Sequence, residues 1–248
     1  MGNTAIDLSG YITQQSKNLW GQLNSIYDIS VEYHNVNEYS VFTQNKTAII
    51  YIPKTAEPCP DSFGHELLHI LVRSTETYIG ASLSRIVKES NTLSAILSTN
   101  LLNHISNCLE HIKMLPLYLN MGFDISRFIV DYNTPKLTIS EVSYLKSTMI
   151  KKSLLRKISY VPMAVDLYIG KYFAVKACPN STINYEPLIK ELKSIDEELW
   201  EILESFWESW LTYDIFKIRE AIDFDYHEMV YDFTDRLEDW QAKREIAY

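Results

Sequence analysis

Hydrophobic residues recur at three- and four-residue spacing along most of the chain, and this spacing predicts helices. We expect helices at residues 5–26, 63–73, 91–114, 139–157, 162–177, 187–212 and 215–243. Three short runs rich in β-branched and aromatic residues predict strands at 29–33, 39–43 and 47–52. The expected fold class is therefore α+β and predominantly α-helical, with a small N-terminal β-sheet followed by a helical C-terminal part.

The second and third predicted strands flank residues 44–46, which suit a hairpin loop. Prolines at 53, 58 and 60 then interrupt the chain. After them, Asp61 or Ser62 can cap the helix at 63–73, since both side chains accept hydrogen bonds from free amide groups. The pattern thus predicts a hairpin followed directly by a capped helix.

A polar loop at 131–135 is the best candidate for a boundary between parts of the chain. It divides the chain into residues 1–133, which contain the predicted sheet, and residues 134–248, in which almost every segment is predicted to be helical. A chain of 248 residues suits one large domain or two small ones, so the two portions could also form a single compact domain.

The composition of the chain argues against some binding partners and some cellular settings. Net charge is −9, which disfavours non-specific nucleic-acid binding, because that binding relies on Lys and Arg. The three cysteines, Cys59, Cys108 and Cys178, do not form a disulfide framework, and we expect a reduced, cytoplasmic setting. No apolar run is long enough to span a membrane, and the first residues lack the features of a secretory signal. We therefore expect neither a nucleic-acid partner nor a membrane.

The negative charge belongs to one end of the chain. Residues 186–248 carry a net charge of −11 and residues 1–185 carry +2. This acidic C-terminal segment also holds four of the five tryptophans: Trp200, Trp207, Trp210 and Trp240. Acidic and aromatic residues at helical spacing usually form amphipathic helices packed on a core. The alternative is an exposed aromatic stripe that docks a protein partner.

The helix at 63–73 contains His65, Glu66 and His69 in an H-E-x-x-H pattern. Two His four residues apart lie on one face of a helix, so both imidazoles can reach one metal ion. The Glu between them can hold and deprotonate a metal-bound water. Zinc suits this role, because it lowers the pKa of its bound water to about 7.

This pattern is not unique in itself, since it should occur by chance in roughly one sequence in a hundred of this composition. Its context strengthens it, because it lies in an apolar helix that follows a strand hairpin, in a chain with only 6 His. The competing interpretation is an ordinary amphipathic helix whose two His face solvent.

With this motif beside a small sheet, the chain resembles the zincin metallopeptidases over roughly residues 29–123. The resemblance implies that residues 1–133 are the catalytic portion and that an extended substrate peptide pairs with an edge strand, for which 47–52 is one candidate. There is a looser likeness to the ImmA/IrrE-like peptidases of bacteria and phages, which cleave regulatory proteins. Their usual downstream pattern is missing here, so their substrate class is not carried over.

A catalytic zinc normally takes three protein ligands and leaves one position for water. Thr75 stands where a metzincin would have its third His, which excludes that branch. We expect the third ligand to be Glu110, from a second helix, because its spacing from an Asn resembles the Glu-type zincins. His111 is the next candidate ligand, or it could act on the developing oxyanion, and His104 is the third.

The sequence thus predicts a zinc-dependent peptidase that acts on a peptide or protein substrate. His65, His69 and Glu110 would bind Zn²⁺, while Glu66, as general base, and His111 would act in catalysis. The alternative is a non-catalytic, zinc-holding helical protein with an interaction or regulatory role and a degenerate zincin fold.

Overall fold

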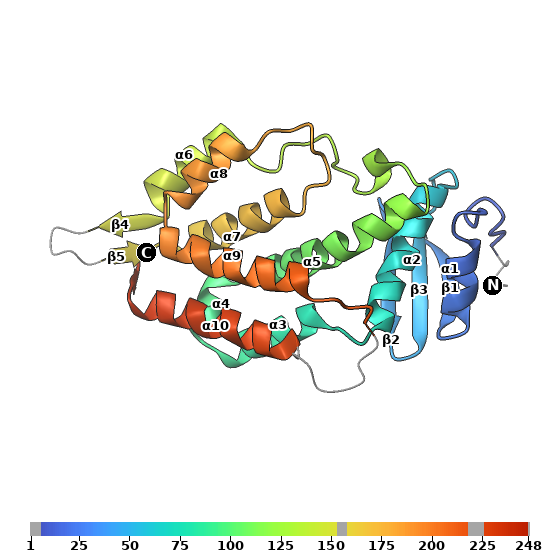
Figure 1. The fold of residues 1–248 in the computed structure, drawn as a ribbon, viewed down its shortest axis with the longest axis horizontal. Coiled ribbons are helices and arrows are strands. Elements are labelled where there is room, and N and C mark those ends of the chain that lie inside the picture. The colour runs from blue at the N-terminus through green and yellow to red at the C-terminus, as the bar shows by residue number, and fades with distance from the viewer. Residues whose placement is uncertain (1–5, 153–157, 218–225, 248) are drawn as a thin grey trace. The chain divides into compact units, whose positions relative to one another are not determined.

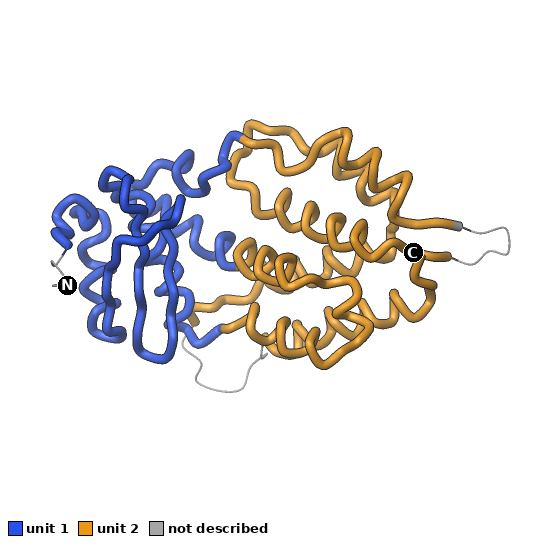
Figure 2. The backbone as a smooth tube through the Cα atoms, turned by 180° about the vertical axis from the view of Figure 1, so that it is seen from behind, with its two compact units in different colours: residues 1–77, 110–133 blue, residues 78–109, 134–248 orange. Residues whose placement is uncertain are grey.

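A computed structural model describes residues 6–152, 158–217 and 226–247 of the chain. The chain forms two compact units (Figure 2). Unit 1 comprises residues 1–77 and 110–133, and unit 2 comprises residues 78–109 and 134–248. One border between the units falls after Asn133, where the sequence also places a boundary. Residues 78–109, however, belong with the C-terminal helices and not with the sheet.

Unit 1 is built on a three-stranded sheet of β1 (Asp28–His34), β2 (Ser40–Gln44) and β3 (Thr47–Pro53). The strand order is β1-β3-β2, with β1 parallel and β2 antiparallel to β3 (Figure 1). All three predicted strands are present. The loop between β2 and β3 is a turn in which Asn45 has a positive φ of 54°, a conformation that Asn tolerates well.

The proposed edge strand at 47–52 is wrong, because β3 lies at the centre of the sheet. The hairpin accounts for only one of the two strands that pair with β3, namely β2. The parallel strand β1 takes the other side, so the edge strand that the hairpin provides is β2.

One face of β3 forms the core of unit 1. Ala48, Ile50 and Ile52 alternate along the strand and are fully buried. They pack with hydrophobic residues of two helices, α1 (Lys17–Asn24) and α2 (Pro60–Ser74). Alternate residues of the strand and helix residues three or four positions apart thus form a single hydrophobic cluster. This cluster fixes α2, which carries the H-E-x-x-H motif.

Helix α2 starts earlier than predicted. Its N-cap is Cys59 and its first residue is Pro60, so neither Asp61 nor Ser62 is the cap. Proline is well suited to this position, because its fixed φ fits the helix and the amide hydrogen it lacks has no partner in the first turn. The helix is buried continuously from Phe63 to Ile70, and the motif lies inside this buried stretch.

Unit 2 is mainly helical, and α5 contributes to both units. The remaining elements are the helices α3 (Ile79–Glu89), α4 (Leu93–Ile96), α5 (Thr99–Asn120), α6 (Ile139–Thr148), α7 (Pro162–Lys176), α8 (Glu186–Lys193), α9 (Glu197–Thr212) and α10 (Tyr226–Ala242), the short helix η1 (Ile125–Arg127) of unit 1, and the strands β4 (Ile150–Lys152), β5 (Ile158–Tyr160) and β6 (Glu245–Ile246). These elements confirm the α+β, predominantly α-helical fold class.

Several helix boundaries differ from the sequence prediction. The helix expected at 5–26 is only α1, and the helix expected at 91–114 is split into α4 and α5, of which α5 continues through Pro116. Met114 and Tyr118, on either side of this proline, are fully buried. Packing of these neighbours stabilises a helix that the proline alone would disfavour.

Two further predicted helices are interrupted. The helix expected at 187–212 is divided into α8 and α9, because Asp196 starts a new helix by accepting a hydrogen bond from the amide of Leu199. The helix expected at 139–157 ends at Thr148, after which β4 begins a second small sheet. Residues 153–157 of that prediction, and residues 218–225 of the helix expected at 215–243, lie outside the described residues.

The four tryptophans of the acidic C-terminal segment are core residues of unit 2. Their exposed fractions are 7% for Trp200, 3% for Trp207, 1% for Trp210 and 0% for Trp240. They come from α9 and α10, which pack against each other. The indole nitrogen of Trp240 donates to Asp196, which also accepts from Arg244. The tryptophans therefore form no exposed stripe, and the amphipathic interpretation holds for them.

None of the helices that the structure describes is both long enough and apolar enough to cross a lipid bilayer.

Two glycines in unit 1 allow a matched test of this packing. A Cβ on Gly64 would lie 2.3 Å from the ring of Phe123, whereas a Cβ on Gly21 would meet nothing within 4 Å. Gly64→Ala should lower the free energy of unfolding by about 1–3 kcal/mol, because it overpacks the core. Gly21→Ala should raise it by about 0.5–1 kcal/mol, because alanine favours the helix. Urea denaturation of both variants checks this, and stabilisation by both would contradict the close contact at Gly64.

Candidate metal centre

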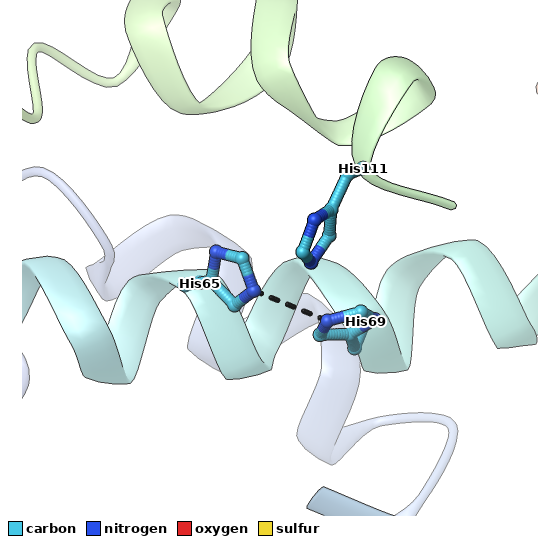
Figure 3. A group of neighbouring side chains, drawn as sticks. All are labelled: His65, His69 and His111. Carbon is cyan, nitrogen blue, oxygen red and sulfur yellow. Dashed lines mark hydrogen bonds between the residues drawn. The ribbon is translucent and has the colours of Figure 1, made fainter. Parts of the chain in front are cut away.

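Three histidine rings meet in unit 1. His65 and His69 lie one turn apart on α2, and His111 points towards them from α5 (Figure 3). Each offers one ring nitrogen to a group whose atoms all lie within 4.8 Å of one another. Within residues 6–152, 158–217 and 226–247, these three side chains form the group that could hold a metal ion.

The spacing between the ring nitrogens fits a metal site. The Nε2 atoms of His65 and His69 are 3.1 Å apart. Two nitrogens bound at about 2.0–2.1 Å to a tetrahedral zinc ion lie about 3.3–3.4 Å apart, so small side-chain rotations separate this arrangement from a ligand pair. Helical spacing of four residues sets this geometry, as the sequence predicts.

Burial favours the form of His65 that binds metals. Its side chain is 8% exposed, and its pKa lies well below the usual value because of burial and of the neighbouring His69 and His111. The ring is therefore neutral at pH 7 and keeps a lone pair for a ligand bond. Its Nδ1 atom is buried without a hydrogen-bond partner, which makes this ring a costly one to bury for packing alone.

Glu110 does not join the three nitrogens but contacts the far side of one of the rings. Its Oε2 atom lies 2.6 Å from Nδ1 of His69. Burial alone would raise the pKa of Glu110, but the hydrogen bond and the charges of His69 and Arg73 lower it. A carboxylate at this position accepts a hydrogen bond from Nδ1–H, which leaves the lone pair of His69 on Nε2, the nitrogen that faces His65.

Glu66 is buried next to the group, with 6% of its surface exposed. Burial raises the pKa of its carboxyl, although His69 and Arg73 oppose part of the shift. A carboxylate with a raised pKa is a stronger base and exchanges a proton more readily near neutral pH. Its position in the motif and its surroundings suit proton transfer.

Aromatic side chains pack against two of the three histidines, His65 and His111. The ring centre of Phe128 lies 4.9 Å from that of His65 and 5.2 Å from that of His111, both in edge contacts. Tyr118 packs on His65 and on Phe128. These contacts restrict the orientation of two candidate ligands. Sequence reasoning missed Phe128, and its only signal is the cluster of aromatic residues shortly after α5.

His104, the third of the candidate ligands, lies outside this group. Its Nε2 atom is 3.2 Å from the carbonyl oxygen of Gly170, and the Cys108 sulfur is 3.6 Å from the same nitrogen. His104 precedes His111 by seven residues, which is about 10 Å along a helix axis. Of the three side chains considered on α5, the structure brings His111 to His65 and His69, and Glu110 to Nδ1 of His69.

Comparison with protein-family models, with curated proteins and with solved structures finds no match to this chain.

Metal binding can be tested ligand by ligand. We expect the wild-type chain to bind one Zn²⁺, and His111→Ala to weaken binding by more than about 100-fold because it removes a ligand. Glu110→Ala should weaken binding by about 10- to 100-fold, because it removes only the partner of His69. Competition with a chromophoric chelator measures the affinities.

His104→Ala is the matched control on the same helix and should bind zinc like the wild type. A loss of affinity in His104→Ala comparable with that in His111→Ala would show that the ligand group is wrongly assigned.

Proposed function

We propose that this protein is a zinc-dependent metallopeptidase that hydrolyses a peptide bond with metal-activated water. The proposal depends on one observation: His111 lies close to the two motif histidines, and the carboxyl of Glu66 is buried beside them. Three histidine ring nitrogens and an adjacent general base are the constituents of a catalytic zinc site.

The proposed ligands are His65, His69 and His111. This set differs from the one expected from the sequence, in which Glu110 was a ligand and His111 acted in catalysis. The distances favour the exchange, because the Glu110 carboxylate is engaged by Nδ1 of His69. Glu110 then orients His69, as carboxylates commonly do for metal-bound histidines.

The residues fit zinc, since three histidines leave a fourth position for water or substrate. When bound, the ion would polarise the scissile carbonyl and lower the pKa of the water. Glu66 would accept a proton from the attacking water and later donate it to the leaving amine. The carboxyl is buried next to His65 on the same helix, a position from which it could accept and release a proton in one cycle.

The resemblance to the zincins rests on the H-E-x-x-H helix next to a small sheet. Strand β2 is the edge strand beside α2, so a substrate peptide would be expected to pair there and not with β3. A peptide or protein substrate and a cytoplasmic setting are parts of this proposal. So is a protein partner at the acidic C-terminal segment, where the buried tryptophans would leave the acidic side chains to make the contact.

Glu66→Gln tests catalysis separately from metal binding. The variant keeps the shape of the side chain but removes the base, so it should retain Zn²⁺ and lose about 10²- to 10⁴-fold in hydrolysis rate. The assay is incubation with a peptide library prepared from a digested proteome, followed by counting of new N-termini by mass spectrometry. Glu89→Gln, an exposed change on α3, is the matched control and should keep full activity.

Equal hydrolysis rates of Glu66→Gln and the wild type would contradict the peptidase proposal. Metal binding without any cleavage by the wild type would favour the non-catalytic, zinc-holding alternative.

A further inference from the structure

Arg73 lies between strand β2 and the candidate metal centre. It follows His69 by four residues on α2 and therefore lies on the same side of the helix. Its Nη1 atom donates to Thr43 Oγ1 at 3.1 Å and to the Val41 carbonyl oxygen at 3.4 Å, both on β2. Its Nη2 atom lies 3.9 Å from Oε2 of Glu110.

These contacts form a continuous path from the sheet to the site. β2 holds one side of the guanidinium, the other side faces the Glu110 carboxylate, and that same Oε2 atom contacts Nδ1 of His69. All four groups belong to unit 1. A guanidinium is planar and rigid, so fixing one of its nitrogens on β2 also fixes the direction in which the other points.

The surroundings strengthen this interaction. The side chain of Glu110 is 14% exposed and that of Arg73 is 27% exposed, so water screens the pair only in part. The separation of 3.9 Å is long for a hydrogen bond, and the attraction is therefore mainly between charges. Such an attraction holds the carboxylate in place without competing for the lone pair that accepts the hydrogen bond from His69.

We propose that Arg73 is a positioning residue that couples strand β2 to the metal affinity of the site, acting through Glu110 on His69. This inference rests on the proposed zinc site and adds a residue that adjusts the zinc affinity of that site. Because β2 is an edge strand, a ligand that repositions it would act on the metal centre through the same contact.

The test is a double-variant cycle on zinc affinity, with the full chain and Zn²⁺ alone as the probe. We expect Arg73→Met to weaken zinc binding about 3- to 10-fold, and Glu110→Gln about 10- to 100-fold. In the Glu110→Gln background, Arg73→Met should have no further effect, because its influence passes through the carboxylate. Arg73→Lys, which keeps the charge, should recover part of the affinity.

A second variant tests the link to the sheet. Thr43→Val removes the hydrogen bond that Arg73 donates to a side chain of β2, and it should weaken zinc binding about two- to fivefold. Arg85→Met, at an exposed position on α3, is the matched control and should bind zinc like the wild type. Should Arg73→Met fail to fold by circular dichroism, Arg73→Lys and Thr43→Val carry the test.

Two results would overturn the inference: unchanged zinc affinity in the Arg73 and Thr43 variants, or effects of Arg73→Met and Glu110→Gln that simply add. Failure of the wild-type chain to bind zinc would instead remove the proposed metal site itself, so the two failures are distinguishable.

Discussion

The hydrogen bond between His69 and Glu110 joins the two helices that supply all the candidate ligands. It connects α2 with α5 across 41 residues of sequence, and both of its partners are largely buried. The register it sets between the helices brings the next residue on α5, His111, to the two motif histidines. The hydrogen bond thus has two effects: it directs the lone pair of His69, and it locates the third ring.

The local part of the site could be predicted from the sequence because it depends on helical spacing alone. His65, Glu66 and His69 occupy one helix, and a separation of four residues places the two rings on one face whatever the rest of the fold does. The choice between Glu110 and His111 could not be predicted in this way. Adjacent residues differ by about 100° around a helix, so the choice depends on which side of α5 meets α2. That orientation is decided by tertiary contacts, among them the hydrogen bond between His69 and Glu110.

The same division between local and tertiary effects explains the other differences. The hairpin of β2 and β3 follows from short-range patterns, but the parallel pairing of β1 with β3, which moves β3 to the centre, is a long-range contact. Helix α5 continues through Pro116 because buried neighbours hold it, which outweighs the intrinsic preference of one residue. Conversely, Asp196 interrupts an otherwise continuous helical pattern through a single capping interaction.

We propose that three histidines hold a zinc ion, with Glu110 hydrogen-bonded to one of them. A crystal structure of the zinc-loaded chain, with anomalous scattering recorded at the zinc edge, tests it most directly. We expect one anomalous peak about 2.0–2.1 Å from ring nitrogens of His65, His69 and His111. The Glu110 carboxylate should remain on Nδ1 of His69. A peak bound by Glu110 in place of His111, or no peak at the three rings, would contradict it.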